Sequence, residues 1–151
     1  MTSTRVSQHI NASRAAVYRT LLDPQAIAQW RVPNGMTSHV HEFDAREGGS
    51  FRVSLTYTTD DAGKTTAHTD TYHGRFLKLV ENEQIIEVVE FETTDPAMQG
   101  EMTITTSLVD ANGSTDLHGV HEGLPPGVAP ADNEYGWQQS LKKLAALVEQ
   151  R

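Results

Sequence analysis

A long run of alternating polar and apolar residues, followed by one amphipathic segment, sets the strongest limit on how this chain can fold. Between about residues 37 and 121 apolar residues recur at every second position, most clearly over 51–57 and 102–108. This period is typical of β-strands that bury one face. The final segment, 130–149, instead carries apolar residues at helical spacing. We therefore expect an antiparallel sheet covered by a long helix, which is an α+β arrangement.

Turn signals divide the alternating run into separate strands. Asn112-Gly113 is the strongest of them, because this dipeptide favours the tight turn of a two-residue hairpin. Further turns are expected at 46–49, 81–83 and 60–64. The expected strands, including one near the N-terminus, are residues 5–10, 37–43, 51–57, 67–80, 84–92, 102–108 and 114–121.

Two short helices are expected before the alternating run. Ser13 can cap the N-terminus of the first, which spans about residues 13–22. Asp23 followed by Pro24 is a second start signal, because Asp accepts a backbone hydrogen bond at the cap and Pro fits the first helical position. The second helix is expected to end near Trp30, before a loop that carries proline, asparagine and glycine.

Composition limits the classes of partner. Of the 151 residues, 37% are hydrophobic and 21% are charged, which is typical of a globular chain, and we expect a single domain over residues 1–151. The formal net charge of −8 disfavours nucleic acid and anionic membranes as partners. The absence of cysteine excludes disulfides, thiolate catalysis and cysteine-bearing zinc sites. The N-terminus has no apolar signal segment and no apolar run approaches the ~20 residues that span a bilayer, so we expect a cytoplasmic protein.

Five segments of the chain resemble sequence motifs of one protein family. In chain order they are Asp23-Pro24 with Trp30; Asp44, Arg46, Gly48, Gly49 and Phe51; Gly74, Arg75, Phe76 and Leu77 with Gln84, Ile85 and Ile86; His121, Glu122, Gly123, Leu124 and Pro125; and Gly136-Trp137 with Leu141 and Leu144. Together with the order of strands and helices, they resemble the Aha-type branch of the START-like (SRPBCC) superfamily. That branch is named for the activator of the heat-shock chaperone ATPase.

The resemblance implies a helix-grip fold. In this fold a curved antiparallel sheet of six to seven strands wraps round a long C-terminal helix, two short helices follow the first strand, and a cavity lies between sheet and helix. Members of the superfamily include lipid carriers, aromatic cyclases, hydratases, hormone receptors and chaperone activators, so the fold does not select one function. The chain departs from the family pattern at Arg31, which stands beside Trp30 where a second aromatic residue is common. A charge is therefore expected at the pocket wall.

Two titratable residues are candidates for chemistry in the cavity. His121 has the strand parity of Leu117 and Gly119, so we expect it to point inward. There it serves either as an acid, base or hydrogen-bond partner at the cavity mouth, or as a brace for the loop that follows. Glu90 faces the cavity if Ile86 faces the core, and is a surface residue if the opposite face is buried. An inward carboxylate would have a raised pKa and could act as a general base or bind a polar head group.

Four further residues are expected to contact a ligand. His73 and Arg75 share the strand parity of Leu77 and Leu79, which points them inward unless a bulge near Gly74 reverses the face. An inward arginine can hold a ligand carboxylate through two parallel hydrogen bonds. Trp30 and Trp137 are expected to form apolar walls of the pocket or the core, because aromatic side chains bury a large area.

His39 and His41 lie two residues apart on an expected strand and therefore share one face. Such a pair can bind a metal when a neighbouring strand supplies a third ligand. The alternative, two solvent-facing imidazoles, is the interpretation that we prefer, and no metal or cofactor is expected.

These observations favour a protein that binds a small, largely apolar organic ligand in an internal cavity, as a carrier or sensor, and that is a monomer or homodimer. One alternative is a cyclase, dehydratase or hydratase that uses Glu90, His121 or Arg75. Another is a protein-interaction module, as the chaperone activators are. The sequence contains no P-loop, no Rossmann glycine pattern and no Ser-His-Asp order, which argues against the familiar nucleotide enzymes, dehydrogenases and hydrolases. We expect binding rather than catalysis.

Overall fold

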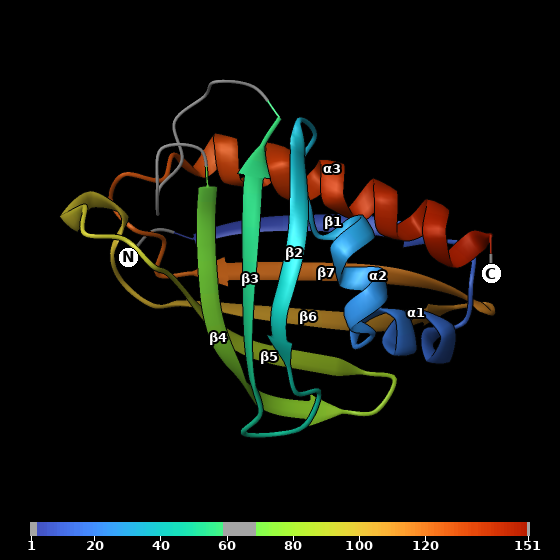
Figure 1. Ribbon diagram of the computed structural model, residues 1–151. Coiled ribbons are helices and arrows are strands. Elements are labelled where there is room, and N and C mark those ends of the chain that lie inside the picture. The colour runs from blue at the N-terminus through green and yellow to red at the C-terminus, as the bar shows by residue number, and fades with distance from the viewer. Residues whose placement is uncertain (1–2, 59–68, 151) are drawn as a thin grey trace.

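The computed structural model describes residues 3–58 and 69–150, which form a seven-stranded antiparallel sheet and three α-helices (Figure 1). The strands are β1 (Ser3–Ile10), β2 (Met36–Phe43), β3 (Ser50–Tyr57), β4 (Thr69–Val80), β5 (Gln84–Phe91), β6 (Met102–Ala111) and β7 (Ser114–Glu122). The helices are α1 (Arg14–Leu21), α2 (Pro24–Trp30) and α3 (Pro130–Glu149), with a short 3-10 helix at Pro96–Met98. The α+β helix-grip fold expected from the sequence is confirmed.

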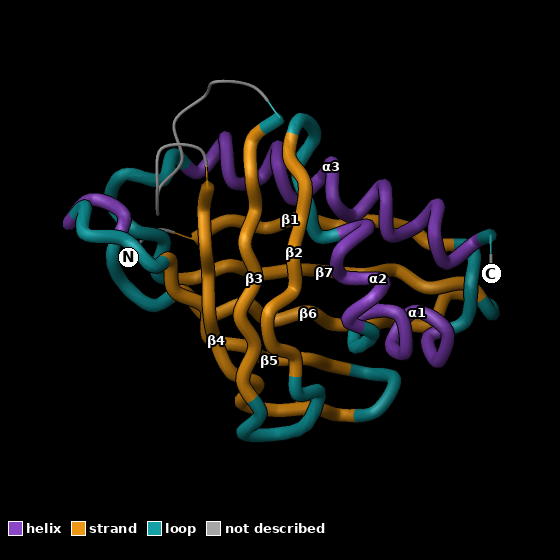
Figure 2. Tube along the Cα trace, viewed as in Figure 1, coloured by secondary structure: helices purple, strands orange, loops and turns teal. Residues whose placement is uncertain are grey.

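The sheet curves round α3. Its strand order is β1-β7-β6-β5-β4-β3-β2, so β1 and β2 form the two edges and α1 and α2 connect them. Figure 1 shows β2, β3 and β4 running across the direction of β1, β6 and β7, with α3 lying over the sheet. Figure 2 shows α1 and α2 gathered near the C-terminal end of α3. On the concave side of the sheet, α1 and α2 therefore cover one end, next to the C-terminal end of α3.

Two hairpins form because asparagine and glycine adopt backbone angles that other residues avoid. In the β6–β7 hairpin, Asn112 has φ 56° and Gly113 has φ 92°, and Ala111 pairs with Ser114. Positive φ at both central residues is the requirement of the tight turn predicted there. Asn82, with φ 62°, closes the β4–β5 hairpin. The turn predicted at 60–64 lies outside the described residues.

The short helices begin at the predicted caps. The Ser13 hydroxyl accepts a hydrogen bond from the Ala16 amide at 3.2 Å, and the Asp23 carboxylate accepts one from the Gln25 amide at 3.0 Å. These bonds satisfy amides that have no partner inside the helix. At the start of α3, by contrast, Ala129 occupies the cap position and supplies no side-chain hydrogen bond.

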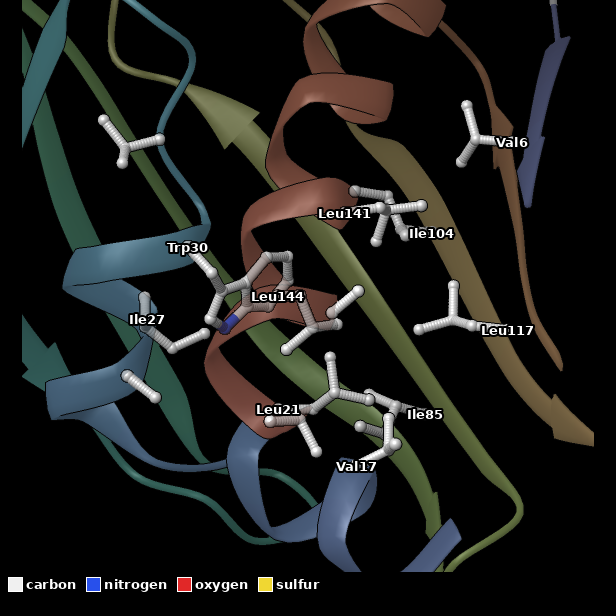
Figure 3. Packing of buried hydrophobic residues seen from close by; sticks show 14 of the residues in the cluster. Val6, Val17, Leu21, Ile27, Trp30, Ile85, Ile104, Leu117, Leu141 and Leu144 are labelled. Atoms are coloured by element: carbon white, nitrogen blue, oxygen red, sulfur yellow. The ribbon is translucent and has the colours of Figure 1, made fainter. Parts of the chain in front are cut away.

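The core lies between the inner face of the sheet and the C-terminal half of α3. Figure 3 shows Leu141 and Leu144 of α3 meeting side chains of α1 and α2 on one side and of the sheet on the other. Among the buried hydrophobic partners drawn there are Val17, Leu21, Ile27, Trp30, Ile85, Ile104 and Leu117. No described helix is both long and apolar enough to cross a membrane.

Shortening one core residue of α3 is expected to destabilise the whole fold. Leu144 is 0% exposed, so Leu144→Ala removes methyl groups from a closely packed site and leaves a cavity. We expect the free energy of unfolding in urea to fall by about 2–5 kcal/mol. Lys142→Ala on the exposed face of the same helix is the matched control and should change it by less than about 0.5 kcal/mol. Equal losses for the two variants would contradict this placement of the core.

Candidate functional site

A cavity of about 420 Å³ lies between the N-terminal half of α3, the inner face of the sheet and the loops that precede β2 and α3. Its size is within the range of small-molecule sites. Most of its wall is apolar or aromatic, and the strands contribute Leu55, Tyr72, Val89, Phe91, Met102 and Ile104. The cavity predicted for this fold is therefore present at the end of the sheet that α1 and α2 leave uncovered.

The helix wall of the cavity contains a glycine. Asn133, Gly136, Trp137 and Ser140 of α3 line it. A Cβ atom built on Gly136 would have no neighbouring atom within 4 Å, so the space beside this residue is open. The volume of the cavity thus depends in part on the absence of a side chain at position 136.

Arg31 brings a positive charge to the cavity wall. It follows directly on the last residue of α2, and its side chain is only 11% exposed. Its Nη1 atom lies 2.7 Å from Oε1 of Glu87, whose side chain is 7% exposed on the inner face of β5. Because removing a charge from water is costly, each of these buried ions depends on the other.

Three aromatic rings surround the guanidinium of Arg31. Its central carbon lies 5.0 Å from the ring centre of Trp137, 5.1 Å from that of Tyr72 and 5.8 Å from that of Phe51. Such cation–π contacts contribute about 0.5–2 kcal/mol each. Burial is the largest single influence and acts to lower the pKa of Arg31, but the combined effects of Glu87 and Tyr72 outweigh it, so the pKa lies above its ordinary value. Arg31 is therefore charged at every physiological pH.

Some polar atoms near Arg31 are buried without a hydrogen-bond partner among the described residues. They are the Tyr72 hydroxyl, the Trp30 indole nitrogen and Oε1 of Glu87. Oε1 is close to Arg31, yet it forms no aligned hydrogen bond, so this contact acts through charge. A void of about 20 Å³ borders Trp30, Arg31 and Glu87, which is space for one water molecule. Burial raises the pKa of Tyr72, so its hydroxyl stays protonated and can donate.

His121 points inward as predicted but lies behind the cavity wall. It is 1% exposed, and its ring centre is 4.7 Å from that of Trp137. The Asn133 side-chain amide donates to Nδ1 of His121 at 2.9 Å and to the Thr4 hydroxyl at 2.8 Å. Burial, with a smaller effect of the Arg31 charge, lowers the pKa of His121 to about 4. His121 is therefore neutral at pH 7 and holds Asn133 and Trp137, two residues that line the cavity.

The structure places Glu90, His73 and Arg75 on the outer face of the sheet, away from the cavity. His73 pairs with Glu90 across strands, and its Nε2 atom lies 3.4 Å from Oε1 of Glu90. Arg75 Nη1 lies 3.3 Å from Oε2 of Glu101. The inward orientation considered for these three residues is thus replaced by an outward one, and the expected grouping of Glu90, Arg75 and His121 does not form.

A bulge explains the outward orientation of His73 and Arg75. The register of β4 against β5 shifts between Phe76 and Lys78. Phe76 is buried and Leu77 is 48% exposed, yet Leu79 packs against the core. Because the bulge reverses the side-chain parity, Leu79 does not report the orientation of residues before it.

Of the two tryptophans, Trp137 lines the cavity and Trp30 packs behind it, with ring centres 6.2 Å apart.

His39 and His41 lie on one face of β2 with ring centres 4.5 Å apart, and both are exposed. The described residues contain no cluster of metal-ligating side chains.

Sequence reasoning missed Glu87 and Tyr72 as site residues and noted Arg31 only as a departure from a family pattern. That departure was the available signal, because a charge next to Trp30 at the expected pocket wall requires a partner of opposite sign. The partner lies on β5, far away in the sequence, and only the fold brings the two together.

Removing one member of the buried ion pair should be more harmful than removing both. Arg31→Met leaves Glu87 without a counter-charge, and we expect a loss of about 3–5 kcal/mol in the free energy of unfolding. The double variant Arg31→Met/Glu87→Leu removes both charges of the pair and should regain most of this loss. Urea denaturation of the wild type and of each variant measures the difference. Additive losses in the double variant would show that the pair is not coupled.

Stability should fall in mild acid because of His121. Its folded pKa of about 4 lies below the unfolded value of 6.5, so the unfolded state binds the proton more readily. The free energy of unfolding should therefore decrease as pH drops below 6.5 and level off near 4, a loss of about 3 kcal/mol for this group. His121→Gln should reduce the acid sensitivity measured by urea denaturation between these pH values. His118→Gln, at an exposed position of the same strand, should leave it unchanged. Parallel pH profiles for wild type and His121→Gln would contradict the assignment.

The fold and sequence match one family of proteins. A family model described as "Activator of Hsp90 ATPase homolog 1-like protein" matches residues 11–149. A crystal structure of a protein from Chromobacterium violaceum has 36% sequence identity and a TM-score of 0.87, covering 97% of this chain and 96% of that one. No protein with a curated description matches this chain.

More distant structures share the fold. A protein from Rhodobacter sphaeroides has 18% identity and a TM-score of 0.79, covering 98% of this chain and 92% of that one. An AHSA1-like protein from Aeromonas hydrophila has 18% identity and a TM-score of 0.74, with the same coverage of 98% and 92%. Because the family model covers nearly the whole chain, this protein belongs to the Activator of Hsp90 ATPase homolog 1-like family, within the START-like (SRPBCC) superfamily.

Proposed function

We propose that this protein binds a small, largely apolar organic molecule in the cavity beside α3. The observation that carries the proposal is the cavity itself, about 420 Å³ in volume and walled mostly by aliphatic and aromatic side chains. A wall of this kind suits a molecule whose binding is driven by removal of apolar surface from water. The helix-grip fold of the family, which holds ligands between sheet and helix, is consistent with this role.

The two alternative functions have less support. The candidate acid and base residues Glu90 and Arg75 lie outside the cavity, and His121 lies behind its wall. A protein-interaction role would be favoured by a continuous apolar surface. The large hydrophobic residues that are exposed in the described part of the chain are Leu77, Val109 and Tyr135, which belong to three different elements.

Filling the cavity from Gly136 should abolish binding without unfolding the protein. The Cβ atom of Gly136→Leu would have no neighbouring atom within 4 Å, so we expect the side chain to extend into the cavity that Gly136 lines. Gly136→Ala is the matched control, because it adds one methyl group and should raise helix stability by about 0.5–1 kcal/mol. Butylbenzene is a suitable apolar probe, and binding can be followed by chemical shift changes in NMR titrations of the three proteins.

We expect butylbenzene to bind wild type and Gly136→Ala and not to bind Gly136→Leu, while all three unfold cooperatively. Native mass spectrometry of gently purified wild type should also show a bound small molecule that is absent from Gly136→Leu. Equal binding by wild type and Gly136→Leu would place the binding site elsewhere. Failure of wild type to bind the probe, together with no co-purified molecule, would contradict the proposed function.

A further inference from the structure

Arg31 and Tyr72 bring hydrogen-bond donors to the cavity wall. Both residues line the cavity, and the guanidinium carbon of Arg31 lies 5.1 Å from the Tyr72 ring centre. A guanidinium has five N–H donors and no acceptor, and the protonated Tyr72 hydroxyl can donate as well. Oε1 of Glu87 lies 2.7 Å from Nη1 of Arg31, and the Arg31 side chain also borders the cavity. A ligand group that fits here must therefore accept hydrogen bonds.

The charge of the site disfavours an anionic ligand. The positive charge of Arg31 is already balanced by Glu87. A further carboxylate, that of Asp132, lines the same cavity. An added carboxylate would lose its hydration, and among the described lining residues it would meet no unbalanced positive charge, so its burial would be costly. A neutral oxygen accepts the same hydrogen bonds and does not carry this cost.

The Tyr72 hydroxyl gives independent support for a polar ligand group. Tyr72 is 5% exposed, and its hydroxyl has no hydrogen-bond partner among the described residues. A buried hydroxyl without a partner lowers stability compared with phenylalanine, which has the same ring. A bound acceptor would supply the partner that this hydroxyl lacks among the described residues.

We propose that the molecule bound in the cavity has an apolar body and one neutral carbonyl oxygen, which accepts hydrogen bonds from Arg31 and Tyr72. This inference rests on the proposed function, because it names the class of ligand for the same cavity. The apolar body lies against Leu55, Val89, Phe91 and Ile104, and the carbonyl group faces Arg31. The ligand class is therefore an apolar ketone, ester or similar carbonyl compound.

Four probes of one shape test the inference. They are 4-phenyl-2-butanone with a neutral carbonyl, butylbenzene with none, 3-phenylpropanoate with a carboxylate, and 3-phenylpropylamine with an ammonium group. Dissociation constants are measured by NMR titration with wild type and Tyr72→Phe. We expect wild type to bind the ketone at least about fivefold more tightly than butylbenzene, as one net hydrogen bond provides. The carboxylate and the amine should bind more weakly than the ketone.

Tyr72→Phe should lose most of the preference for the ketone and bind butylbenzene as well as wild type does. It should also be at least as stable as wild type in urea, since it removes a hydroxyl without a partner. The variant Arg31→Met/Glu87→Leu should likewise lose the preference for the ketone. A Tyr72→Phe variant that is less stable and keeps the ketone preference would show that the hydroxyl has a structural role, and would overturn the assignment.

The outcomes separate this inference from the proposed function. If butylbenzene and the ketone bind wild type equally, the carbonyl class is wrong and the apolar binding site stands. If the carboxylate or the amine binds most tightly, the cavity prefers a charged head group, and the proposed neutral carbonyl is wrong. If no probe binds wild type, the proposed function fails together with the inference.

Discussion

A single helix is too narrow to fill the concave side of this sheet. This difference in width determines where the other two helices pack and where the cavity lies. Seven strands at a spacing of about 4.8 Å span roughly 29 Å, whereas a helix with its side chains is about 10–12 Å wide. The helices α1 and α2 fill the remaining space at one end and bury the inner face there. At the other end no described α-helix other than α3 packs against the sheet, and the cavity lies there.

The ion pair of Arg31 and Glu87 lies where the filled part of the sheet meets the hollow part. Arg31 follows the last residue of α2, so the helix that completes the core also delivers the charge to the cavity wall. Its three aromatic neighbours come from β3, β4 and α3. The pair therefore links the end of α2 to the wall of the cavity.

The parts of the fold that depend on neighbouring residues could be predicted, and those that depend on distant pairing could not. Asn112-Gly113 and Asp23-Pro24 determine their turn and helix start through local backbone geometry, and both were placed correctly. The face of β4 was misjudged because Leu77, counted as inward, is 48% exposed, and because the register shift between Phe76 and Lys78 reverses the parity of Leu79 relative to the residues before it. Glu87 was overlooked because a carboxylate on a strand is ordinarily at the surface, and its partner is distant in sequence.

The uneven burial of α3 has a consequence for the route by which a ligand enters. All the buried residues of this helix lie at or after Ser140, and its N-terminus has no side-chain cap. The first turns border the cavity and can therefore fray at a lower free-energy cost than global unfolding. Such local opening would admit a ligand while Leu141, Leu144 and Val148 keep the second half of the helix packed on the sheet. Backbone amides near the start of α3 would then exchange with solvent deuterium sooner than those near its end. The first half of the helix would control access to the cavity, while the second half holds the helix on the sheet.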